Sequence, residues 1–300
     1  MNPIIWEPEV LDQIREIHFR AKQAVAGLTI GSHRSVKTAR NIEFADYKEY
    51  TPGDPIRDVD WRVAARSDRL VIRRHQAESE MAVTLLIDAS GDLGTGQTGG
   101  VPPGTKWAYV QVLAACLALL FQTRRDPVGL AILGGEDVPF RNISARLGRN
   151  HLANIVGTLA QTKPGGRADL EAGLSLLGRR LKRRTMVIML SDLMEDPTSW
   201  GPMLGAFASR KLDLRVAQII DRDEWSMALP ESARFYSPEG GKDLVVDPQA
   251  TRRVFAEEAA AFAQQVRDVL VGNECRHMLV STDESFVEVV GRLANERDPA

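Results

Sequence analysis

Apolar strand candidates alternate with helix candidates over residues 80–300, and this alternation limits the possible folds more than any other feature of the sequence. The first strand candidate, Ala82–Ile87, is nearly all apolar, which is typical of a strand buried on both faces. Further strands are expected over residues 128–133, 138–143, 185–190, 214–220 and 277–280, and helices over 106–123, 150–161, 169–182, 198–209 and 248–270 and from residue 285. Strands separated by helices run parallel, so this order predicts an α/β fold with a doubly wound, mainly parallel sheet between two layers of helices.

Oxygen-bearing side chains follow two of the predicted strands. Asp88, Ser90 and Asp92 lie just after the first strand candidate, and Asp192 follows the strand over residues 185–190. Open α/β sheets bind ligands at the carboxyl ends of their strands where the winding reverses, so these two strands are expected to be neighbours there. Oxygen side chains at alternate positions suit Mg²⁺ or another hard divalent cation. The sequence predicts either a metal site, with Asp192 as a fourth ligand held directly or through water, or a plain acidic turn.

A glycine-rich loop precedes the helix over residues 106–123. Gly99 and Gly104 have the spacing of a phosphate-binding P-loop, but Thr105, Lys106 and Trp107 follow instead of Lys and then Ser or Thr. Two prolines also restrict the backbone between these glycines, where a P-loop turns its amides toward phosphate. We therefore interpret the spacing as accidental and expect no nucleotide here.

Residues 1–79 lack the alternation of strands and helices seen in the rest of the chain. They are predicted to form an N-terminal region, followed by an α/β domain over residues 80–300. Apolar residues recur at helical spacing over Pro8–Leu28, which indicates an amphipathic helix. Its apolar stripe is expected to pack on the main domain, and docking to a partner is the alternative. Short strands over residues 42–50 and 70–75 predict a small, charged, β-rich subdomain.

Arginine and aspartate alternate in this subdomain. The favoured interpretation is a set of salt bridges whose charges offset one another. The alternative is a site for phosphate or an acidic partner, because guanidinium groups bind such anions bidentately. The residues predicted for partner binding are Arg57, Asp60, Trp61, Arg62 and Arg66.

Composition argues against several classes of protein. The net charge of −2 disfavours a general nucleic-acid binder. Cys116 and Cys275 lie in apolar surroundings, which favours a reduced cytoplasmic interior over disulfides. The first residues lack the basic and apolar segments of a secretion signal, and the nearly apolar run Ala108–Phe121 is too short to span a bilayer. We therefore expect a soluble cytoplasmic protein without direct membrane insertion.

A segment near the N-terminus carries a specific resemblance. Residues Glu43–Leu70 read E-F-A-D-Y-K-E-Y-T-P-G-D-P-I-R-D-V-D-W-R-V-A-A-R-S-D-R-L. Together with G-S-H-R-S at Gly31, D-P-V-G-L at Asp126, S-D-L at Ser191 and D-R-D-E at Asp221, this segment resembles the DUF58 family, which has a von Willebrand factor A-like domain. The resemblance covers almost the whole chain. It implies a sheet flanked by helices and a site like the metal-ion-dependent adhesion site.

The adhesion-type pattern is D-x-S-x-S, then a threonine, then an aspartate on a later loop. By resemblance, Asp88 and Ser90 match its first two ligands, and Asp192 matches the late aspartate. Asp92 stands in place of the second serine, and Ala168 in place of the threonine. With a divalent ion bound, the three ionised aspartates would leave the site at about −1. The site is therefore expected either to hold metal without strongly recruiting an acidic partner, or to stay empty with one carboxylate protonated.

The resemblance implies a non-enzymatic adaptor that works beside a MoxR-type AAA+ ATPase in the assembly or maturation of a client protein. The five histidines are scattered, and none lies beside a serine or cysteine in a catalytic motif. The alternative is a magnesium-dependent phosphohydrolase that uses the crevice of Asp88 and Asp192 to orient water and substrate. That reaction would need a nucleophile or base and phosphate-binding cations, for which the sequence has no motif.

Overall fold

The computed structural model describes residues 8–32, 44–51, 59, 61–67, 70–75, 81–95, 105–136, 139–222, 233–235, 244–246 and 248–294. The chain divides into an α/β unit, Met1–Leu28 with Met81–Ala300, and a smaller unit, Thr29–Glu80. The smaller unit ends near residue 80, where the sequence predicted a boundary. The N-terminal helix, however, groups with the α/β unit and not with the charged segment after it, which differs from the predicted division into residues 1–79 and 80–300.

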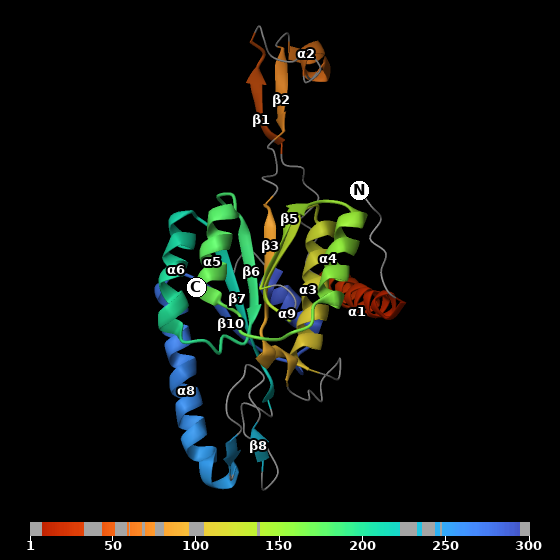
Figure 1. The fold of residues 1–300 in the computed structure, drawn as a ribbon. Coiled ribbons are helices and arrows are strands. Elements are labelled where there is room, and N and C mark those ends of the chain that lie inside the picture. Colours follow the sequence, from red (N-terminus) through yellow and green to blue (C-terminus); the bar gives the residue numbers. More distant parts are fainter. Residues whose placement is uncertain are drawn as a thin grey trace. The chain divides into compact units, whose positions relative to one another are not determined.

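A six-stranded sheet forms the centre of the α/β unit (Figure 1). In the order in which they lie side by side, its strands are β10 (Arg276–Ser281), β7 (Asp213–Ile220), β6 (Met186–Ser191), β3 (Val83–Ala89), β4 (Val128–Gly134) and β5 (Phe140–Arg146). Neighbouring strands are parallel, except that β4 and β5 form an antiparallel pair at one edge. The predicted doubly wound, mainly parallel sheet is confirmed.

Helices cover both faces of this sheet (Figure 1) and build a separate apolar core on each. The first core holds side chains of α1 (Pro8–Ser32), α3 (Lys106–Thr123), α4 (Arg149–Gln161) and α9 (Phe286–Ala294). The second core holds side chains of α5 (Leu170–Arg180), α6 (Pro197–Ser209) and α8 (Pro248–Gly272). Successive strand residues alternate between the cores, so that Leu85 and Ile87 enter the first and Leu86 enters the second.

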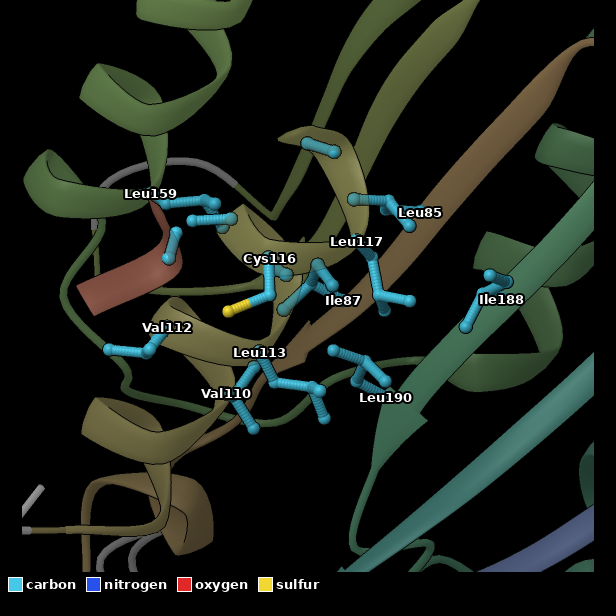
Figure 2. Close-up of a cluster of buried hydrophobic side chains, with 14 of the residues drawn as sticks. Leu85, Ile87, Val110, Val112, Leu113, Cys116, Leu117, Leu159, Ile188 and Leu190 are labelled. Atoms are coloured by element: carbon cyan, nitrogen blue, oxygen red, sulfur yellow. The ribbon is translucent and has the colours of Figure 1, made fainter. Parts of the chain in front are cut away.

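The helix α3 fills the centre of the first core. Figure 2 shows its Leu113 and Leu117 beside Ile87 and Leu190 of the sheet. Among the described helices, α3 alone is long and apolar enough to cross a membrane by length and composition, but 72% of it is buried inside the fold. A helix that is apolar on all sides is expected in such a place, in agreement with the buried helix predicted over Ala108–Phe121.

The strands β3 and β6 lie side by side, with Ile87 opposite Leu190. From β3 the chain passes through α3, on one face of the sheet, to reach β4, whereas it reaches β6 through α5 on the other face. The winding therefore reverses between β3 and β6, and the carboxyl ends of these two strands form the place where such sheets bind ligands. The predicted pairing of the strands that lead to Asp88 and Asp192 is confirmed.

Short elements complete the described chain. The smaller unit contains the antiparallel strands β1 (Phe44–Glu49) and β2 (Val71–His75) and the helix α2 (Trp61–Ser67), which agree with the predicted short strands. In the α/β unit, the polar insertion after β7 contains a second antiparallel pair, β8 (Ala233–Phe235) and β9 (Leu244–Val246).

The residues predicted for partner binding lie in the smaller unit. Trp61 begins α2 and is 61% exposed, and Arg66 in its last turn is also exposed. Arg57, Asp60 and the side chain of Arg62 lie outside the described residues. Partner binding by this segment stays a prediction.

Candidate site at the carboxyl end of the sheet

A cavity of about 90 Å³ lies at the carboxyl ends of β3 and β6. The four predicted metal ligands all line it, namely Asp88, Ser90, Asp92 and Asp192. The rest of its lining consists of Arg167, Met194, Glu195 and Asp196. The fold thus brings together oxygen side chains from two strand ends that are far apart in the sequence.

Asp88 is buried at the floor of this site, and both of its carboxylate oxygens accept hydrogen bonds. The backbone N–H of Ser90 donates to Oδ1 at 2.8 Å, and the hydroxyl of Ser191 donates to Oδ2 at 2.6 Å. Burial, and then the charge of Asp192, raise the pKa of Asp88 to about 7, although the bonds from Ser191 and Ser90 act in the opposite direction. Burial beside Asp192 therefore favours the neutral form of this carboxyl more than exposure to water would.

A buried lysine lies beside the second carboxylate. The Nζ of Lys106 donates to Oδ2 of Asp192 at 3.2 Å, and the two side chains are only 6% and 5% exposed. Lys106 begins α3, directly after Thr105, whose side chain caps the helix. The sequence reasoning missed this residue, because Lys106 was considered only as part of an imperfect P-loop. The available signal was a lysine at the start of an otherwise apolar helix.

The loop after β6 is held by buried polar contacts. The Ser191 hydroxyl, which donates to Asp88, also accepts the backbone N–H of Leu193 at 2.9 Å. Leu193 has a φ of 55°, a left-handed conformation that is costly for a branched residue. The side-chain amide of Gln218 in β7 donates to the Asp192 carbonyl at 3.2 Å. These contacts orient the Asp192 carboxylate toward the cavity and Lys106.

A second loop is hydrogen-bonded to the end of β3. Gly91 donates to the carbonyl of Gly166 at 2.9 Å, and Gly165 donates to the carbonyl of Ala89 at 3.0 Å. Gly134, at the end of β4, has a φ of 77°, and a Cβ on it would lie 3.2 Å from the Ala89 carbonyl carbon. The site loops therefore pack backbone against backbone, which leaves no space for a side chain at residue 134.

Two residues depart from the adhesion-type pattern, and the structure shows where they lie. Asp92 lies in a single turn of 3₁₀ helix, Gly91–Gly94, and is half-buried at the cavity. Ala168 is 3% exposed, and its methyl group belongs to the second apolar core. The place that the resemblance assigns to a threonine ligand therefore offers no side-chain oxygen.

Several features of this arrangement oppose the binding of a divalent cation. Within the part of the chain that the structure describes, no three His, Cys, Asp or Glu side chains are grouped so that they could hold a metal ion. Both oxygens of Asp88 already accept hydrogen bonds, and the ammonium of Lys106 lies on Asp192. A cation on Asp192 would be repelled by that ammonium or would have to displace it. Metal binding by Asp88, Ser90, Asp92 and Asp192 stays a prediction.

Two acidic residues at the rim of the cavity accept backbone hydrogen bonds from the first turns of helices. The carboxylate of Glu195 accepts the backbone N–H of Leu170, at the start of α5, at 3.3 Å. Asp196 caps α6 by accepting the backbone N–H of Thr198 at 2.9 Å, which lowers the pKa of this aspartate. Directly before these two residues, Met194 is 55% exposed. An apolar side chain is thus presented to solvent from a fixed loop beside the acidic cavity.

The sequence model of a known family, described as "Protein of unknown function DUF58", matches residues 46–265. The chain belongs to the DUF58 family. The family prediction is thereby confirmed. A relative described as "Uncharacterized protein Rv1480" from Mycobacterium tuberculosis is 27% identical over 300 residues, which cover 98% of this chain and 91% of that relative.

Solved structures similar to this DUF58 protein include two bacterial or VWA-domain chains of low sequence identity. One is the conserved hypothetical protein BatB from Bacteroides thetaiotaomicron, with a TM-score of 0.44 and 12% identity over 71% of this chain and 98% of that chain. The other is the SpRpn10 VWA domain, with a TM-score of 0.41 and 12% identity over 71% of this chain and 94% of that chain.

Proposed function

We propose that this DUF58 protein is a protein-interaction adaptor that binds its partner at the rim of the cavity between β3 and β6. The observation that carries the proposal is that the buried carboxylates of the cavity are hydrogen-bonded to other groups of the same chain. The carboxylates of Asp88 and Asp192 are bound to Ser90, Ser191 and Lys106 of the same chain. These groups hold the loops in place, and the side chains of Arg167 and Met194 at the rim are exposed to solvent.

The partner we propose is a MoxR-type AAA+ ATPase, with which the protein acts in the assembly or maturation of a client. The family resemblance supports this part of the proposal. An adaptor for such a machine needs a rigid surface that keeps its shape while the ATPase moves. The backbone hydrogen bonds between residues 89–91 and 165–166 supply that rigidity at the cavity.

An adaptor accounts for the cavity better than a magnesium-dependent phosphohydrolase does. Pockets that bind small molecules typically have volumes of about 300–1,000 Å³, whereas this cavity measures about 90 Å³. A phosphohydrolase also needs cations directed at phosphate, but Lys106 is directed at Asp192. Magnesium-dependent phosphatase turnover that is abolished in Asp88→Asn would favour the hydrolase instead.

Binding to purified MoxR-type ATPase from the same organism tests the proposal. Affinity would be measured by biolayer interferometry with a non-hydrolysable ATP analogue, for the native protein, Arg167→Glu and Met194→Asp. We expect each rim variant to weaken binding by about tenfold or more, as expected for a contact worth at least 1.4 kcal/mol. Arg183→Glu is the matched control, because Arg183 is exposed and precedes β6, at the opposite end of the same strand. Equal weakening by the control, or none by the rim variants, would reject this surface.

A further inference from the structure

Lys106 places a positive charge against a carboxylate of a site that, by its resemblance to the adhesion-type pattern, would hold a metal ion. Its Nζ lies 3.2 Å from Oδ2 of Asp192, the residue that matches the late aspartate of the pattern and lines the cavity. Lys106, Asp192 and Asp88 are all buried, and the charge of Asp192 acts on Asp88. A buried ammonium thus contacts a carboxylate that a metal ion would need.

Neither the stability nor the packing of α3 explains a lysine at position 106. The first turn of a helix carries partial positive charge, so a lysine there opposes the helix dipole. Lysine is also rarely buried, and it loses its hydration when it is. The remaining buried residues of α3 are nearly all apolar, and an apolar residue at position 106 would extend the same packing. The interaction that compensates these costs is the ion pair with Asp192.

We propose that Lys106 supplies the fixed positive charge of this site in place of a divalent cation. The ammonium and a metal ion would compete for the same carboxylate, so the native protein keeps its crevice intact without metal. The buried Ala168 fits this arrangement, because a site that holds no ion needs no threonine oxygen. A partner then meets a surface whose shape does not depend on the concentration of divalent ions.

The proposal predicts that metal binding appears when the lysine charge is removed. Lys106→Met keeps an unbranched side chain one atom shorter than lysine, but leaves Asp88, Asp92 and Asp192 without the ammonium. Binding of Mn²⁺ alone would be measured by electron paramagnetic resonance of the free ion and by isothermal titration calorimetry. We expect no saturable binding to the native protein up to millimolar Mn²⁺, and an affinity at least about tenfold higher for Lys106→Met. Lys163→Met is the matched control and should behave as the native protein, because Lys163 is an exposed lysine outside the cavity lining.

The test does not rest on the adaptor function, because it uses the isolated chain and one inorganic ion. Lys106→Met together with Asp192→Asn removes both charges of the pair, and this double variant should fold and bind no Mn²⁺. Failure of Lys106→Met to gain Mn²⁺ binding would overturn the proposal. One Mn²⁺ bound per native chain and lost in Asp192→Asn would also overturn it. If Lys106→Met does not fold, the test rests on the native protein. Absence of Mn²⁺ binding to the native protein supports the proposal, and Mn²⁺ binding that is lost in Asp192→Asn rejects it.

Discussion

The buried ion pair between Lys106 and Asp192 allows a stability prediction to be worked from the structure. Its nitrogen and oxygen are 3.2 Å apart, and the side chains are 6% and 5% exposed. At that separation, an effective dielectric constant of about 20 gives an attraction of about 5 kcal/mol. Removal of one partner from a buried pair costs about 3–5 kcal/mol, because the other charge stays buried without compensation. We expect Lys106→Met to lower the free energy of unfolding by about this amount.

Urea denaturation followed by circular dichroism, without divalent ions, measures this change. The double variant Lys106→Met with Asp192→Asn should recover most of the loss, because no uncompensated charge remains. The pair between Arg15 and Asp12 in α1 is a matched control, since its distance is 3.1 Å but its side chains are 78% and 76% exposed. Arg15→Met should change stability little. If Lys106→Met had an equally small effect, the ammonium would be hydrated, and the argument for a buried cation in the site would fail.

Three further predictions concern the residues around the site and the core. Gly134→Ala should lower the free energy of unfolding by about 1–2 kcal/mol in the same assay, because it adds a Cβ at a left-handed position against Ala89. Gly272→Ala is the control and should not lower it, because a Cβ at residue 272 would meet nothing within 4 Å. Burial raises the pKa of the Asp88 carboxyl from 3.8 to about 7, so the folded state holds a proton there that the unfolded state releases. Stability should therefore fall as the pH rises through this window, and this fall should be smaller in Asp88→Asn, as measured by urea denaturation at pH values across it. Burial raises the pKa of Cys116 to about 12 and of Cys275 to about 11. A thiol reagent should therefore label neither cysteine in the native protein and both in guanidinium chloride, and rapid native labelling of Cys116 would contradict its place in the first core.

The sheet could be predicted from the sequence because its signals are local. Apolar runs such as Val83–Ile87, followed at once by carboxylates, mark both a buried strand and its end. Once the order of strands and helices is known, the topology of a doubly wound sheet leaves few positions for each strand. The meeting of Asp88 and Asp192 could be predicted on this basis.

The ion pair could not be predicted in the same way, because it depends on tertiary contacts. Lys106 and Asp192 are 86 residues apart, and a lysine before an apolar helix has no periodic signal that reveals its partner. The 3₁₀ turn Gly91–Gly94 was not predicted either, although Asp92 within it lines the cavity as its spacing from Asp88 and Ser90 indicated. The packing of α1 on the α/β unit, by contrast, was predicted from its apolar stripe, and Ile17, Ala21 and Val25 do enter the first core.

Three features around the site become consistent when they are considered together. Ala168 supplies no oxygen where the pattern has a threonine, Lys106 places a charge that would repel a metal ion on Asp192, and Ser191 donates a hydrogen bond to Asp88. The first two would weaken a metal site, and the contacts of Lys106 and Ser191 hold the two carboxylates within the chain. On our proposal, recognition by such a site does not use an ion that bridges to a partner carboxylate. It uses the shape and charge of the rim, where Arg167, Met194 and Asp196 are exposed.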